Sequence, residues 1–253
     1  MLRIGAHMSV AGGVSKAVDR AVIHGCEALQ IFTKNANRWQ SKPLDPGEIK
    51  RFRRRIDETG ITPVVSHASY LINLATTVPL LRSMSVDALV DELDRAHALG
   101  LLGVVIHPGT CTAGTEEDAL RLVGEAVRDA FRRRPRRKTM VLLEHTAGQG
   151  RTIGHRFEQL IGRDRLRAFH ANDSKRPCGS RVDRHEHIGN GCLGLEPFRW
   201  LLHDERFVGR PLLIETEKTA DCNKPHLVVP DPLDRRNLDT LRRLRDEQLS
   251  ESA

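Results

Sequence analysis

The sequence has few cysteines, and none of them stands in the paired spacing of a zinc-binding motif. The five that occur are widely separated, with no Cys-x-x-Cys pair: Cys26, Cys111, Cys178, Cys192 and Cys222. An odd, scattered set of this kind argues against both a zinc ribbon and a disulfide framework. We therefore expect reduced thiols and a cytoplasmic protein.

Long apolar runs are also absent. No run reaches 18 apolar residues, and the opening MLRIGAHMSV has no basic segment followed by an apolar one, so we expect neither a membrane span nor a signal peptide. There is no short repeat and no linker. With 253 residues, 39% of them hydrophobic, the chain can build one domain with a sizeable core. We expect a single, monomeric domain over 1–253, ending in a helix or tail over about 230–253.

The charge is biased towards the basic side. Forty Lys and Arg residues outnumber 33 Asp and Glu residues, which gives a net charge of +7 and a pI of about 9.5. A basic balance favours anionic partners such as nucleic acid. It is equally compatible with basic side chains that only solvate the surface.

Seven short apolar segments alternate with amphipathic ones. The apolar segments predict β-strands over 2–9, 28–35, 62–70, 103–109, 139–146, 165–173 and 211–218. Between them, segments such as 45–60 and 86–100 show the i, i+3, i+4 spacing of a helix and end at a glycine. This alternation favours a parallel sheet covered by helices and, at this length, a TIM-like (β/α) barrel. Such a barrel has eight strands, so only seven of its eight β/α units are recognisable.

Nearly every predicted strand ends in a chemically capable polar residue. These residues are His7, Lys34, His67, His107, Glu144, His170 and Glu215. Any one of them alone is more often a satisfied histidine or a surface acid. Barrel enzymes, however, build their sites at the carboxyl ends of the strands, where residues distant in sequence meet. The repeated pattern therefore predicts an active site on that face.

Eight segments, in order and with matching spacing, resemble the endonuclease IV family of apurinic/apyrimidinic DNA endonucleases. The resemblance covers roughly residues 1–220 and rests on IGAHMSVAGG, IFTKNANRW, SHASYLINLA, IHPGT, LLEHTAGQG, FHANDSK, GSRVDRHEHIGNG and LLIETEK. One such segment would be weak, but eight in register are specific.

The resemblance implies a TIM-barrel DNA-repair enzyme with three zinc ions. Such enzymes cut the phosphodiester 5′ to an abasic site in double-stranded DNA, leave a 3′-hydroxyl, and clear blocked 3′ ends. The implied ligands are His67, His107 and Glu144 for the first ion, Glu144, His170 and Glu215 for the second, and Asp183 and His185 for the third. Glu144 bridges two ions in this assignment, and we expect it to be catalytic.

The residue types agree with this assignment. Imidazole and carboxylate groups are suitable zinc ligands. Asp183 and His185 are separated by one residue, so in an extended segment their side chains point to the same side. A metal cluster lowers the pKa of a bound water and stabilises charge on phosphate oxygens, which is what phosphodiester hydrolysis needs.

Two loops and the segment after the sixth predicted strand supply candidate DNA contacts. They are Lys34, Asn35, Arg38, Trp39, Tyr70, Leu71, Lys175 and Arg181. In the family, the first two loops enter the minor groove and wedge the duplex open, and apolar wedges can offset unstacking at a lesion. Ordinary core packing is the alternative for Tyr70 and Leu71, and packing at the rim is the alternative for Trp39.

One family feature is missing. The family has a sixth strand that ends in an IDTCH-like motif, and nothing in residues 147–168 matches it. The missing β/α unit amounts to roughly 30 residues. Without its Asp and His, the second ion lacks a ligand and the third keeps only Asp183 and His185, so we expect fewer than three firmly bound zinc ions.

Two other interpretations remain open. The missing unit is compatible with a catalytically impaired protein that binds damaged DNA without cutting it. Metal-dependent sugar isomerases and epimerases share the His/Glu arrangement at the strand ends. The basic charge and the two predicted DNA-binding loops argue against the sugar-active class.

Overall fold

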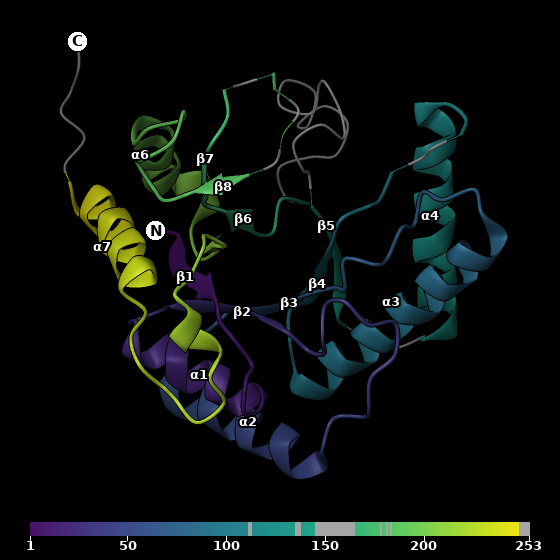
Figure 1. Ribbon diagram of the computed structural model, residues 1–253, viewed down its shortest axis with the longest axis horizontal. Helices are drawn as coiled ribbons and strands as arrows, with labels where there is room; N and C mark the ends of the chain where they lie inside the picture. Colours follow the sequence, from purple (N-terminus) through teal and green to yellow (C-terminus); the bar gives the residue numbers. More distant parts are fainter. Residues whose placement is uncertain are drawn as a thin grey trace.

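A parallel β-sheet of seven strands forms the centre of the molecule. The computed structural model describes residues 1–110, 113–134, 138–144, 165–177, 179–180, 182 and 184–247. The strands are β1 (Arg3–His7), β2 (Ala28–Phe32), β3 (Val64–His67), β4 (Gly103–Ile106), β5 (Met140–Leu143), β6 (Phe169–His170) and β9 (Pro211–Ile214). They pair in the order β5-β4-β3-β2-β1-β9-β6. Figure 1 shows the sheet curling into an incomplete barrel with its helices outside.

Alternating side chains divide the strands between two apolar layers. Ala28, Val65, Val105 and Leu213 form a small cluster on the inner face of the curl. Intervening residues such as Ile4, Leu29 and Leu212 belong to the larger core that packs under the helices. Both faces of the central strands are thus buried, which explains why they read as apolar runs in the sequence.

Six helices of the described chain cover the outer face (Figure 1): α1 (Val14–Ile23), α2 (Pro46–Thr59), α3 (Pro79–Leu99), α4 (Glu116–Arg133), α6 (Glu196–His203) and α7 (Pro232–Asp246). Helix α2 begins after Asp45, whose side chain accepts the backbone N–H of Glu48, and it ends at Gly60 with φ +67°. Helix α3 ends in the same way at Gly100. These ends match the expected stop signals because glycine adopts the left-handed conformation without strain.

Smaller elements connect the later strands. An antiparallel pair, β7 (Asp173–Ser174) and β8 (His185–Glu186), follows β6. Two 3₁₀ turns, η2 (Glu205–Phe207) and η3 (Ala220–Asn223), precede and follow β9. Helix α7 lies in the C-terminal region predicted to be helical. No helix in the described part of the chain is long and apolar enough to span a membrane.

All seven predicted strand segments contain a strand of the sheet, and the observed strands are shorter. Most of the extra predicted residues that the structure describes at the carboxyl ends lie in loops, such as 33–35 after β2 and 107–109 after β4, whereas Asp173 begins β7. Helix α3 begins seven residues before the predicted start at Val86, with Pro79 at its first turn. Proline suits that position because its missing N–H needs no partner there.

Strands β5 and β6 are the two outer strands of the sheet that the described residues form. Among the described residues, β5 pairs only with β4 and β6 pairs only with β9. The predicted missing unit belongs at this point of the barrel, and residues 145–164 lie outside the described residues. Leu143, at the end of β5, is 55% exposed, which fits a strand at the edge of a sheet.

Asp231 connects the segment after β9 to α7 and allows a test of the fold. Its buried carboxylate accepts the backbone N–H groups of Leu233, Asp234 and Thr219 and the Thr219 hydroxyl. We expect Asp231→Ala to lower the free energy of unfolding by about 2–4 kcal/mol, because it removes a helix cap and leaves buried donors unpaired. Asp45→Ala, at an exposed cap, should cost about 0.5–1 kcal/mol. Urea denaturation measures both, and equal losses would contradict this role of Asp231.

Candidate metal centre at the strand ends

Side chains from four strand ends gather around the carboxylate of Glu144, which lies at the end of a fifth strand. His67 ends β3, His107 follows β4, Glu144 follows β5, His170 ends β6 and Glu215 follows β9. Because the strands are parallel, their carboxyl ends meet at one face. Within the described residues, these side chains form two groups able to hold a metal ion, each with ligand atoms within 4.8 Å of one another: His67, His107 and Glu144, and Glu144, His170 and Glu215.

The two carboxylate oxygens of Glu144 serve different groups. Oε2 lies 3.2 Å from His67 Nε2 and 2.9 Å from His107 Nε2. Oε1 lies 2.7 Å from His170 Nδ1, which is also 3.2 Å from Glu215 Oε2. One carboxylate therefore faces two imidazoles on one side and an imidazole and a second carboxylate on the other, as a bridging ligand requires.

Both carboxylates are held in the ionised form. Burial opposes ionisation of Glu144, but contacts with His107, His170 and His67 bring its pKa well below the usual range. Burial also opposes ionisation of Glu215, but its interactions with His170 and its hydrogen bond with His7 outweigh this effect and lower its pKa to about 2. A cluster with two buried anionic carboxylates and three imidazoles is suited to a multivalent cation.

The orientation of His67 also suits metal binding at the first group. His67 Nδ1 lies 2.7 Å from the backbone carbonyl of Ala68. Donation of the Nδ1 proton to this carbonyl leaves Nε2, the atom that faces Glu144, free to bind a metal. Metal-binding histidines are commonly oriented by such a contact at their other nitrogen.

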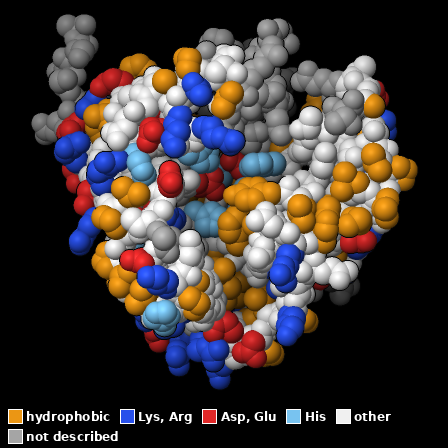
Figure 2. Space-filling view, viewed as in Figure 1, with side chains coloured by type: hydrophobic (Ala, Val, Ile, Leu, Met, Phe, Trp, Pro, Cys, Tyr) orange, Lys and Arg blue, Asp and Glu red, His pale blue; other side chains and the backbone are white. Residues whose placement is uncertain are grey.

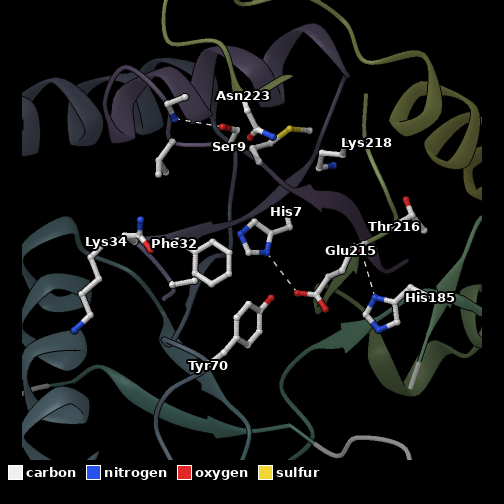
Figure 3. A pocket seen from close by; sticks show the side chains of 15 residues that line it. His7, Ser9, Phe32, Lys34, Tyr70, His185, Glu215, Thr216, Lys218 and Asn223 are labelled. Atoms are coloured by element: carbon white, nitrogen blue, oxygen red, sulfur yellow. Dashed lines mark hydrogen bonds and ion pairs between the residues drawn. The ribbon is translucent and has the colours of Figure 1, made fainter. Parts of the chain in front are cut away.

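A pocket of about 690 Å³ adjoins the second group. His7, Phe32, Tyr70, His185 and Glu215 are among the side chains that line it, and Figure 3 shows them arranged around one opening. In the space-filling view, histidine and acidic side chains lie in a hollow at the centre of this face, next to a hydrophobic area (Figure 2). The site is therefore open to solvent and to a ligand.

Comparison with known proteins agrees with this geometry. The family model described as xylose isomerase-like TIM barrel matches residues 18–162 and 156–244. The protein is 39% identical to probable endonuclease 4 of Chloroflexus aurantiacus, over 96% of this chain and 98% of the relative. It is also 39% identical to that of Trichlorobacter lovleyi, over 95% and 99%. The chain belongs to the endonuclease IV family.

Solved structures give the same result. Endonuclease IV from Thermus thermophilus superposes with a TM-score of 0.80 at 31% identity, over 96% of this chain and 98% of that one. A 3-keto-D-glucoside 4-epimerase from E. coli reaches a TM-score of 0.64 at 15% identity, over 97% and 99%. The second likeness shows the barrel fold alone, so the family assignment rests on the endonuclease relatives.

The shortened chain is visible in these alignments. The alignment with the Chloroflexus aurantiacus relative runs over 289 positions, 36 more than this chain has residues. The two matches to the family model meet at residues 156–162, where the sequence places the missing β/α unit. At least 36 positions of this alignment therefore have no residue of this chain, a number close to the size of one such unit.

The third predicted metal group is described only in part. His185 lies in the pocket, with Nδ1 3.3 Å from the backbone carbonyl of Glu215, whereas Asp183 lies outside the described residues. His187 Nδ1 is 2.9 Å from the side-chain amide of Asn237 on α7. Asp173 has a structural role, because its carboxylate accepts the backbone N–H groups of Ser174, Gly189, Gly191 and Leu193. The assignment of a third ion to Asp183 and His185 stays a prediction.

The predicted DNA-binding loops lie beside the pocket and are joined to each other. The carbonyl of Ala36 accepts hydrogen bonds from the Ser69 hydroxyl, at 2.6 Å, and the Tyr70 backbone N–H, at 3.1 Å. Tyr70 is 57% exposed, and its ring lies 5.3 Å from that of His67. Burial, together with the charges of Glu215 and Glu144, raises the pKa of Tyr70. The exposure of Tyr70 disfavours the core-packing alternative for this residue.

The other loop residues differ in how accessible they are. Asn35, Arg38 and Lys175 are exposed, Leu71 is half-buried, and Trp39 packs partly against the core. Arg181 lies outside the described residues. The rim packing of Trp39 agrees with the alternative given for it, and the DNA contacts of the whole set stay predictions.

Lys34 has partners within the protein. Its side chain is 1% exposed, and its Nζ lies 2.8 Å from Asp91 Oδ2 and 3.6 Å from Glu92 Oε1, both on α3. Glu92 also accepts the Thr33 hydroxyl and the Ser69 backbone N–H. In Figure 3 the Lys34 side chain points away from His7 and Glu215. Lys34 therefore holds the loop after β2 against α3, and its contact with DNA stays a prediction.

Gln30 is a site residue that the sequence patterns did not indicate. This fully buried residue of β2 contacts His170, Glu215 and His7. The available signal was one amide within the apolar strand Ala28–Phe32. His7 Nδ1 also lies 3.4 Å from Glu215 Oε1, and burial lowers the pKa of His7 despite that carboxylate.

The shared carboxylate gives a direct prediction for metal binding. Glu144→Gln keeps the shape of the side chain but removes the charge on which both groups depend. We expect its zinc affinity to fall at least about 100-fold at both groups, because even residues that only orient ligands contribute 10–100-fold. Glu125→Gln, on the surface of α4, is the matched control and should bind zinc normally. Competition with a chromophoric chelator measures both, and unchanged binding by Glu144→Gln would contradict the bridging role.

Proposed function

We propose that the protein is a zinc-dependent DNA-repair endonuclease. It hydrolyses the phosphodiester 5′ to an abasic site in double-stranded DNA, leaves a 3′-hydroxyl, and removes blocking groups from 3′ ends. Membership of the endonuclease IV family supports the reaction class. The observation that carries the proposal is the division of the Glu144 oxygens between two groups of ligands. Two neighbouring metal positions suit an in-line displacement at phosphorus.

His67, His107 and Glu144 would hold one zinc ion, and Glu144, His170 and Glu215 would hold another. The ions would supply Lewis acidity, which lowers the pKa of water and offsets negative charge on the phosphate. The protein's own contribution is to fix the ligands: Glu144 stays ionised between its three histidines, and His67 is held by the Ala68 carbonyl. Asp183 and His185 alone are a weak third set, so we propose fewer than three firmly bound ions.

The DNA partner follows from charge and from the rim of the pocket. A net charge of +7 attracts the phosphate backbone. Exposed Asn35 and Arg38 extend from one loop and exposed Tyr70 from the next. Because these loops are hydrogen-bonded to each other, they form one surface beside the pocket, and an aromatic side chain there can fill the space left by a missing base.

An incision assay tests this function. The zinc-loaded protein is incubated with a duplex that contains one abasic-site analogue and with an undamaged duplex of the same sequence. We expect a single cut 5′ to the lesion that EDTA abolishes and added zinc restores. Glu144→Gln should cut at least about 100-fold more slowly, because it removes the shared metal ligand, whereas Glu125→Gln should cut at the normal rate.

The missing β/α unit supports a second candidate, a protein that binds damaged DNA without cutting it. Preferential binding of the lesion duplex without incision, measured by fluorescence anisotropy, would favour this candidate and contradict the first. Equal behaviour towards the lesion and undamaged duplexes would contradict both.

A further inference from the structure

Gln30 is a polar residue in a buried, otherwise apolar strand. It lies in the middle of β2, between Leu29 and Ile31, and it has no solvent exposure. Burying an amide is unfavourable unless its hydrogen-bonding groups are satisfied. Here all of them have partners: Nε2 contacts Glu215 Oε1 and lies 3.0 Å from His7 Nδ1, and Oε1 lies 2.9 Å from His170 Nε2.

The chemistry of these partners fixes the orientation of the amide. The NH₂ group of Gln30 faces Glu215 Oε1 and donates to it, which suits the acceptor character of a carboxylate oxygen. The amide oxygen then faces His170 and accepts the proton on Nε2. His170 Nδ1 is left on the opposite side of the ring, where it faces Glu144 Oε1 and Glu215 Oε2.

We infer that Gln30 is the positioning residue of the second metal group. It holds His170 with its proton on Nε2, so that Nδ1 is the ligand atom. It also binds Glu215 Oε1, which turns Oε2 towards the same position. One neutral amide thus orients two of the three ligands, and this inference rests on the metal centre proposed above.

Two features make this role important in the present chain. The second group has only three ligands among the described residues, and a site with few ligands depends strongly on their being held in place. Gln30 contacts ligands of the second group only. In the first group, His67 is oriented instead by the Ala68 carbonyl. A substitution at Gln30 should therefore lower the zinc affinity of the second group and leave that of the first group unchanged.

The test compares zinc binding by the wild type and Gln30→Met, which has a similar length and no hydrogen-bonding amide. Gln40→Met, at an exposed position, is the matched control. Isothermal titration of the metal-free proteins should resolve two ions in the wild type. In Gln30→Met we expect the affinity for one ion to fall about 10–100-fold while the other stays within about threefold. Gln30→Asn, whose amide is too short to reach both partners, should have the same effect and serves if Gln30→Met does not fold.

Nitrogen NMR on the zinc-loaded wild type adds a readout that only a positioning role would move. His170 should show a zinc-bound Nδ1 and a protonated Nε2, and Gln30→Met should lose this pattern. Normal binding of both ions by Gln30→Met and Gln30→Asn, or a zinc-bound Nε2 of His170 in the wild type, would overturn the inference and leave the metal centre intact. A wild type that binds no zinc would overturn the metal centre as well.

Discussion

The carboxylate of Glu144 is the interaction on which the rest of the site depends. It is the only ligand that belongs to both groups of the described residues, and three histidines from three strand ends contact it. Its burial would make an isolated charge unfavourable, and the surrounding imidazoles reverse that preference. The same arrangement that stabilises the carboxylate makes it a ready bridge between two cations.

The position of Glu144 in the sheet shows why an incomplete barrel can still carry a site. Its backbone N–H continues the ladder to the carbonyl of Ile106 on β4, so the residue is held from one side of the opening. His170 and Glu215 approach from the other side, on β6 and β9. The candidate ligands therefore meet between β5 and β6, which do not pair with each other among the described residues, and His170 Nδ1 already lies 2.7 Å from Glu144 Oε1 across this gap.

The features that depend on local sequence patterns could be predicted from the sequence. Apolar runs placed the seven strands, and the rule that parallel strands present their carboxyl ends on one face predicted that His67, His107 and Glu144 meet. The structure supplied what depends on contacts between distant segments. Lys34 was predicted to contact DNA, and its ion-pair partners Asp91 and Glu92 are more than 50 residues away on α3. The role of Gln30 could not be predicted from its apolar strand, because it depends on contact with His170, 140 residues later in the chain.

The most direct measurement of the central claim is anomalous X-ray scattering at the zinc edge from crystals of the zinc-loaded protein. We expect two peaks roughly 3.5–4 Å apart, one on each side of the Glu144 carboxylate. One peak would lie near His67 and His107, and the other near His170 and Glu215. A single peak, or peaks that do not contact Glu144, would contradict the claim that this carboxylate joins two metal ions.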